Sequence, residues 1–146
     1  MKMKKTTLAL TLIALGTAAL AHTGVQNRDV MARMVVMSTI GDQMKLIGSM
    51  AKGEAAFDAD AVNAALIEIA AQSAQIPSMF ETKALDPKSE ALPAIWERFD
   101  SFTKQAREAE SVAERLAGTV TAVDDLGPVL AQVGETCKAC HTTFRK

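Results

Sequence analysis

Three residues near the C-terminus have the types and the spacing for chemistry at a bound group. Two residues separate Cys137 from Cys140, and His141 follows at once. On a helix, at ~100° per residue, His141 lies ~40° from Cys137, and Cys140 lies ~60° to its other side, so the three share one face. The pattern C-x-x-C-H is typical of covalent haem attachment, in which both thiols form thioethers and the imidazole binds the iron.

Other uses of a cysteine pair fit this position less well. A thioredoxin-like redox pair needs a strand-to-helix turn, whereas this motif lies inside a helical pattern. A structural zinc site needs a second pair of ligands, and the 146 residues contain only these 2 Cys. A third alternative is a bundle without a cofactor, in which the pair forms a disulfide. We predict one haem c, held by Cys137 and Cys140 with His141 on the iron.

The second axial ligand of the iron is less directly indicated. The other histidine, His22, lies near the N-terminus, so we do not expect two histidine ligands. Methionine is a common alternative. The first helical segment contains Met31, Met34, Met37, Met44 and Met50. These flexible side chains could equally fill irregular gaps in the core, and spacing alone leaves both interpretations open.

Four amphipathic helices are expected to position these residues. The first spans residues 26–52 and ends at Gly53. The second begins at Asp58 or Asp60 and stops just before Pro77. The third runs from Pro93 to Ala117, and the fourth from Asp124 or Asp125 to the C-terminus. Segment 77–92 is the long connection, and Gly118 closes the third helix. Helices of this length predict an all-α, antiparallel four-helix bundle with sites built from facing side chains.

The first helix carries a heptad-like pattern. Its members are Val30, Met34, Met37, Gly41, Met44, Gly48 and Ala51. Spacings of three and four predict the seam of a helix pair. Because Gly41 and Gly48 lower helix propensity, we expect something to approach the backbone closely there.

The chain resembles the class II cytochromes c, the family of the cytochromes c-prime and their low-spin relatives with methionine and histidine ligands. The resemblance covers essentially all of the chain after the N-terminal segment. It is carried by the haem motif with Phe144-Arg145, by Lys52-Gly53-Glu54 followed by Phe57-Asp58, and by Pro93-Ala94-Ile95-Trp96, in this order. The haem motif is highly specific, and the other two are moderately specific.

The resemblance implies roles for three further residues. Met37 falls where the family has either a residue that blocks the distal face or a methionine ligand. Arg33, one turn earlier, matches an arginine near a haem propionate, and the alternative is a solvated charge. Arg145 matches a basic residue beside the proximal histidine, and the alternative is a charge that complements the dipole at the helix C-terminus.

Two functions follow from the two possible states of the iron. Segment 76–80 and the Trp96 region look more like the low-spin branch, and the chain lacks the Gly-Pro-Gly loop that many c-prime members carry. We therefore predict a one-electron carrier with His141 and Met37 on the iron, and no enzyme. The alternative is a five-coordinate cytochrome c-prime that binds nitric oxide or carbon monoxide.

The first 21 residues resemble a secretory signal peptide. Lys2, Lys4 and Lys5 precede an apolar run, and small residues end at Ala21. We expect cleavage there, a domain over 22–146, and a periplasmic protein without stable membrane insertion. Removal of residues 1–21 leaves 13 basic and 17 acidic residues, a net charge of −4. This charge excludes a nucleic-acid binder and favours redox partner proteins with basic patches. A homodimer is a further possibility.

Overall fold

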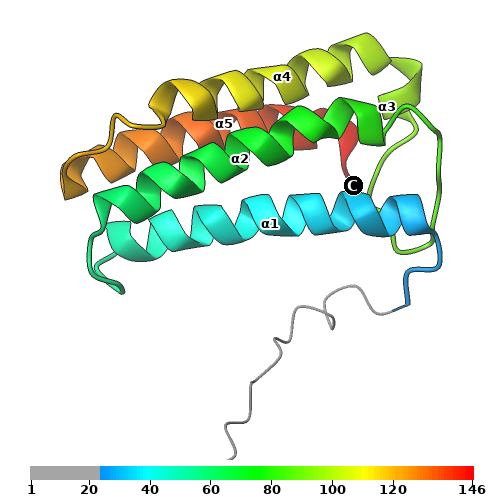
Figure 1. Cartoon of the computed structure of the whole chain (residues 1–146). Helices are drawn as coiled ribbons and strands as arrows, with labels where there is room; N and C mark the ends of the chain where they lie inside the picture. The colour runs from blue at the N-terminus through cyan, green and yellow to red at the C-terminus, as the bar shows by residue number, and fades with distance from the viewer. Residues whose placement is uncertain (1–23) are drawn as a thin grey trace, which may run out of the picture.

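Four long helices run antiparallel in the structure, a computed structural model that describes residues 24–146 (Figure 1). The elements are α1 (Arg28–Ala51), α2 (Ala59–Met79), the short α3 (Ala94–Glu97), α4 (Phe99–Leu116), a 3-10 turn (Val123–Asp125) and α5 (Leu126–Phe144). The predicted four-helix bundle is confirmed. The predicted signal peptide, residues 1–21, and His22 lie outside the described residues.

The helix ends are capped by side chains and glycines, all of them predicted except Asn27 before α1. Asn27 accepts hydrogen bonds from the backbone N–H groups of residues 29 and 30, and Asp58 accepts one from Ala61. Gly53 and Gly118 adopt positive φ angles of 72° and 80° just after α1 and α4. At the start of α5, the carboxylate of Asp125 accepts the backbone N–H groups of residues 121 and 122, at 2.9 Å each.

Two predicted boundaries are wrong. The second helix does not stop before Pro77 but continues to Met79. The proline lies in the last turn, where its missing N–H costs a single hydrogen bond, and its ring is buried. The predicted third helix is interrupted at Arg98, with φ −132° and ψ 47°. The short α3 before this break is held to the end of α2, because Trp96 Nε1 donates to the carbonyl of Phe80 at 2.8 Å.

The predicted helix-pair seam on α1 is also wrong. The buried residues of α1 are Val30, Arg33, Val36, Ile40, Ile47 and Met50. After Val30, each lies one position before a residue of the predicted seam, so the buried face is rotated about the helix axis relative to that seam. Ala51, at the end of the predicted seam, is exposed. α1 packs on α2, α2 on α4 and α4 on α5, whereas α1 and α5 make few contacts. The middle of the predicted seam therefore faces space between α1 and α5 instead of another helix.

Arg33 joins α1 to the connection that follows α2. Its side chain is only 5 % exposed, and it donates to the carbonyls of Met79 (2.8 Å), Thr82 (2.6 Å) and Ala84 (3.1 Å). The guanidinium also lies 4.3 Å from the centre of the Phe80 ring. Burial lowers its pKa, although the nearby Asp29 opposes this. The interpretation of Arg33 as a solvated charge is wrong, because the residue is an internal brace.

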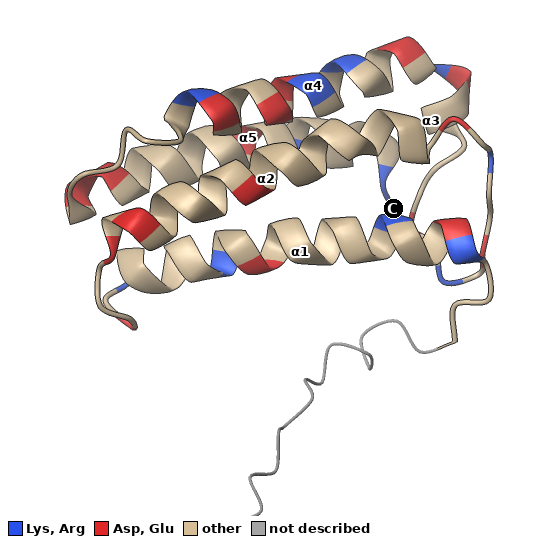
Figure 2. Cartoon of the chain, in the orientation of Figure 1, with Lys and Arg blue, Asp and Glu red and all other residues tan. Residues whose placement is uncertain are grey.

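The surface is unevenly charged. Figure 2 shows few charged residues on the visible faces of α1 and α2 and more along α4. Residues 53–60 and the turn before α5 carry several acidic side chains at the same end of the bundle. Within residues 24–146, no helix is long and apolar enough to cross a membrane.

The brace predicts a stability difference between two arginines of α1. Arg33→Met should lower the free energy of unfolding by about 3 kcal/mol, because three carbonyls lose their charged donor. Arg28→Met is the matched control, since Arg28 is exposed at the start of the same helix, and a change within about 0.5 kcal/mol is expected. Urea unfolding followed by circular dichroism measures both. Equal effects would contradict the role given to Arg33.

Candidate functional site

A cavity of about 710 Å³ lies inside the bundle and is lined by all four long helices and by residues 88–91 of the connection. This volume is in the range of sites for small molecules and cofactors, roughly 300–1,000 Å³. All six residues singled out in the sequence lie on its wall: Arg33, Met37, Cys137, Cys140, His141 and Arg145. The fold thus brings together residues that are more than 100 positions apart in the chain.

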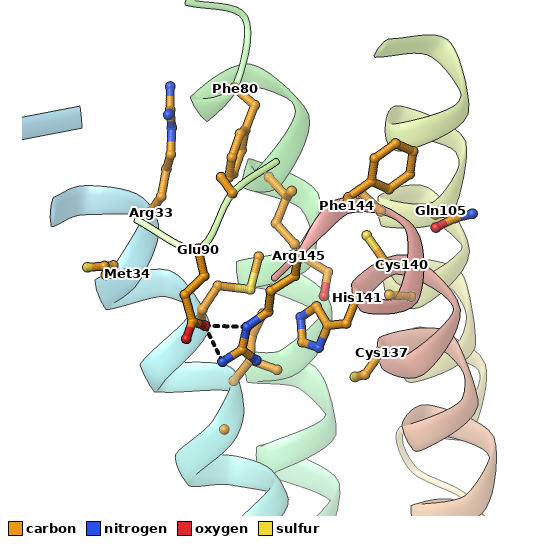
Figure 3. Close-up of a pocket in the computed structure, with 18 of the residues that line it drawn as sticks. Arg33, Met34, Phe80, Glu90, Gln105, Cys137, Cys140, His141, Phe144 and Arg145 are labelled. Carbon is orange, nitrogen blue, oxygen red and sulfur yellow. Dashed lines mark hydrogen bonds and ion pairs between the residues drawn. The ribbon is translucent and has the colours of Figure 1, made fainter. Parts of the chain in front are cut away.

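One wall of the cavity is the face of α5 that was predicted to carry the chemistry. Val129, Val133 and Phe144 are buried and fix the rotation of α5 on the core. Cys137, Cys140 and His141 are half-buried and lie on the cavity side of this helix (Figure 3). Both cysteines are free thiols and do not form a disulfide. α5 therefore packs on the other helices through apolar residues and leaves the side chains of the cysteine–histidine motif accessible from the cavity.

The environment of the two thiols favours their uncharged forms. Burial raises the pKa of both cysteines, and for Cys140 burial and the neighbouring Cys137 raise it to about 11. Redox-active and zinc-binding cysteines need the thiolate and usually have a lowered pKa. Among the described residues there is also no group of three or more His, Cys, Asp or Glu side chains that could hold a metal ion. An uncharged thioether suits this site better than a thiolate.

The surroundings of His141 favour its neutral form. Burial lowers its pKa, the positive charge of Arg145 lowers it further, and Glu90 opposes both. The neutral imidazole therefore persists to a lower pH than in an exposed histidine, and it is the neutral ring that offers a lone pair to a metal.

The opposite wall is formed by α1. Met34, Met37 and Met44 all line the cavity, with Gly41 between the last two. Met37 and Met44 pack against the core, whereas Figure 3 shows the side chain of Met34 pointing away from His141. A Cβ atom placed on Gly41 would have no neighbour within 4 Å, so the glycine opens onto free space.

Arg145 closes one end of the site together with a residue that the sequence analysis missed. The guanidinium pairs with Glu90, and residues 90–92 run antiparallel to the chain end, with the Leu92 N–H donating to the Phe144 carbonyl at 2.9 Å. In Figure 3, this pair lies between α1 and His141. Glu90 is 55 positions away from Arg145, and nothing in its local pattern signals the contact.

Gln105 on α4 is the second residue that was missed. Its Oε1 atom is buried on the cavity wall without a hydrogen-bond partner in the part of the chain that the structure describes. Buried polar atoms are nearly always paired, so an unpaired one next to a cavity indicates a group or a water that belongs there. A signal did exist in the sequence, because Gln105 follows Phe102 by three positions on the inward side of the helix.

Comparison with known proteins identifies the family. A sequence model described as "Cytochrome C'" matches residues 28–145. Cytochrome c-556 of Agrobacterium fabrum is 33 % identical over 146 residues, covering 99 % of this chain and 97 % of the relative. Cytochrome c' of Pararhodospirillum photometricum is 36 % identical over 117 residues, with 78 % and 93 % covered. The chain belongs to the cytochrome c' family.

Solved structures agree with this assignment. An NMR-validated structural model of oxidised cytochrome c556 of R. palustris superposes with a TM-score of 0.76 at 27 % identity, covering 83 % of this chain and 98 % of that one. Cytochrome c' of Rhodopseudomonas palustris gives 0.74 at 30 % identity, with the same coverage. The predicted family and fold class are confirmed, and haem c is the cofactor of this class II cytochrome.

The cavity fits a haem. It is enclosed mainly by apolar side chains, it places two uncharged thiols and a neutral imidazole on one wall, and it leaves free space above Gly41. A porphyrin is a large apolar ring, so its burial would cover the α1 residues that no helix covers. The empty space along α1 is thus the physical reason why the predicted helix-pair seam failed.

The two glycines of α1 should respond differently to alanine. Gly48 is outside the cavity wall and has space for a Cβ, so Gly48→Ala should raise the free energy of unfolding by about 0.5–1 kcal/mol. In the haem-loaded protein, Gly41→Ala should gain less and should perturb the visible spectrum, because its methyl group enters the haem space. Equal stabilisation with an unchanged spectrum would mean that no group lies against α1 at Gly41.

Proposed function

We propose that this cytochrome is a one-electron carrier whose haem iron has two protein ligands, His141 from α5 and Met37 from α1. The observation that carries the proposal is that both residues line one cavity from opposite helices. The haem supplies the redox couple, and a thioether ligand raises its reduction potential relative to a second histidine. With both positions filled, the iron has no open site for substrate or gas.

Each motif residue has a defined task in this proposal. Cys137 and Cys140 hold the haem through thioethers on the α5 wall. The backbone carbonyl of His141 accepts from the Arg145 N–H at 3.1 Å, so the last turn of α5 stays closed beside the imidazole. Arg145 places a positive charge near the His141 imidazole, and Glu90 balances it. An electron carrier works best when its structure changes little between the oxidised and reduced states, and a packed helical bundle restricts such changes.

Met37 is preferred over the other two methionines on the cavity wall. Met34 points away from His141 (Figure 3). Met44 lies seven residues, or about 10.5 Å, further along α1, on the far side of Gly41. Arg33, one turn before Met37, is fixed by three hydrogen bonds to the connection after α2. This brace restricts sliding and rotation of α1 where Met37 lies, as a stable iron–sulfur bond requires.

A five-coordinate gas-binding cytochrome c' is the alternative function. It is favoured by a specific observation, since relatives with the names cytochrome c-556 and cytochrome c' match the chain about equally well. In that case Met37 would only cover the distal face, and nitric oxide or carbon monoxide would bind the iron there.

We also propose a periplasmic location after cleavage of residues 1–21, and transient redox partners with basic patches. The support is the N-terminal sequence pattern and the excess of acidic residues in the remaining chain.

Substitution of Met37 separates the two functions. In the haem-loaded protein, Met37→Ala should convert low-spin to high-spin iron and allow carbon monoxide to bind, because the sixth ligand is lost. Met44→Ala is the matched control and should remain low-spin. Visible absorption spectra of oxidised and reduced protein measure both. A carrier with unchanged spectra after Met37→Ala would require a different sixth ligand.

Haem attachment is tested by the cysteines. Replacement of both Cys137 and Cys140 by Ala should allow acidified organic solvent to extract all haem, whereas the wild-type chain should keep its haem. Each single variant should keep haem through one thioether. Haem that resists extraction from the double variant would refute the proposed attachment.

A further inference from the structure

The haem propionates need cationic or hydrogen-bonding partners at the rim of the cavity, and the resemblance to the family suggests Arg33. The structure gives Arg33 a different task. Three of its nitrogen atoms already donate to the carbonyls of residues 79, 82 and 84. The group also packs on the rings of Phe80 and Trp96. Its charge is thus compensated by the connection after α2.

The charge of Arg145 is compensated as well. Its guanidinium pairs with the carboxylate of Glu90, and the backbone on either side of this pair is held by hydrogen bonds between residues 90–92 and 144–146. A propionate that took Arg145 as its partner would have to displace Glu90 and would leave this carboxylate unpaired beside a second negative group.

Lys88 is the remaining cation on the cavity wall. Its side chain is exposed at the rim and makes no ion pair or side-chain hydrogen bond to any residue within 24–146. Two acidic residues are two positions away in sequence. Glu90 pairs with Arg145, and Asp86 accepts three backbone N–H groups, from residues 26, 27 and 88. Those bonds lower the pKa of Asp86 and hold its carboxylate on the backbone, and the charge of Lys88 lowers this pKa as well. The two side chains still form no direct ion pair within residues 24–146, so the Lys88 ammonium keeps its hydrogen-bond donors for another acceptor.

Ser89 adds a second donor beside Lys88. It is half-buried on the same wall, and its Oγ atom accepts the Ala91 N–H at 3.2 Å. Because a hydroxyl both accepts and donates, the Ser89 hydroxyl proton is free to be donated into the cavity. An ammonium and a hydroxyl on consecutive residues form a pair of donors suited to a carboxylate.

The position of these residues agrees with the chemistry of haem. The vinyl groups that form thioethers and the two propionates lie on opposite edges of the porphyrin. In Figure 3, Cys137 and Cys140 lie at α5, whereas Glu90, the residue after Ser89, lies on the other side of His141, toward α1. The connection is therefore on the side of the cavity away from the thioethers.

We propose that Lys88 and Ser89 bind a haem propionate, and that Arg33 serves as a brace for the connection that carries them. This assignment rests on the proposed attachment of haem to Cys137 and Cys140, but it does not depend on whether Met37 binds the iron. In this assignment Lys88 raises the reduction potential of the haem, because a positive charge near a propionate stabilises both the carboxylate and the reduced iron.

The test is the reduction midpoint potential of the haem-loaded protein as a function of pH. Lys88→Met should lower the potential, and the pH dependence caused by propionate ionisation should move up by about one pH unit, since a neighbouring cation lowers the pKa of a carboxyl group by about that much. Lys88→Arg should restore both. Ser89→Ala should shift the pH dependence in the same direction without a change in charge.

The matched control is Lys104→Met, which removes the same charge from an exposed position on α4 away from the cavity wall. Equal shifts in Lys88→Met and Lys104→Met, with full haem content, would overturn this proposal alone. Loss of haem from the wild-type chain in acidified organic solvent would overturn the proposed attachment, and this proposal with it. The two failures are therefore distinguishable.

Discussion

An apolar helix face in water must be covered, and in this bundle one face of α1, with Met37, Gly41 and Met44, is turned to a cavity instead of to another helix. α1 and α5 meet at few points, and the space between them is the cavity that carries every predicted site residue. A haem in that space would supply the missing part of the core, because its ring would remove the methionines of α1 and the cysteine-bearing wall of α5 from water. Fold and cofactor thus depend on the same apolar surface.

The brace at Arg33 belongs to the same arrangement. A cavity of this size weakens the packing between α1 and its neighbours, so α1 needs another restraint. Arg33 provides it by donating to three carbonyls at the end of α2 and in the connection that follows. The Glu90–Arg145 pair and the short antiparallel contact at the chain end hold α5 in a similar way. Both ends of the site are therefore tied to the α2–α3 connection.

Local rules predicted the parts of this structure that local interactions determine. Several residues that begin and end the helices were found from capping patterns, as Gly53, Asp58 and Gly118 illustrate, whereas Asn27, the end of α2 at Met79 and the break at Arg98 were missed. The cysteine motif predicted the rotation of α5, because three reactive residues had to share a face. The prediction failed for the seam of α1, because that face lines the cavity and does not pack on a helix. It also missed the contact of Glu90 with Arg145 and the three acceptors of Arg33, since pairs 46 to 55 positions apart leave no periodic trace.

The central claim is that the iron carries two protein ligands, and the visible absorption spectrum of the purified haem-loaded protein tests it most directly. Spectra are recorded oxidised and dithionite-reduced, before and after addition of carbon monoxide. Sharp low-spin bands that carbon monoxide does not change are the expected result, because Met37 and His141 fill both axial positions. Broad high-spin bands that shift with carbon monoxide would contradict the account and would establish an open distal face.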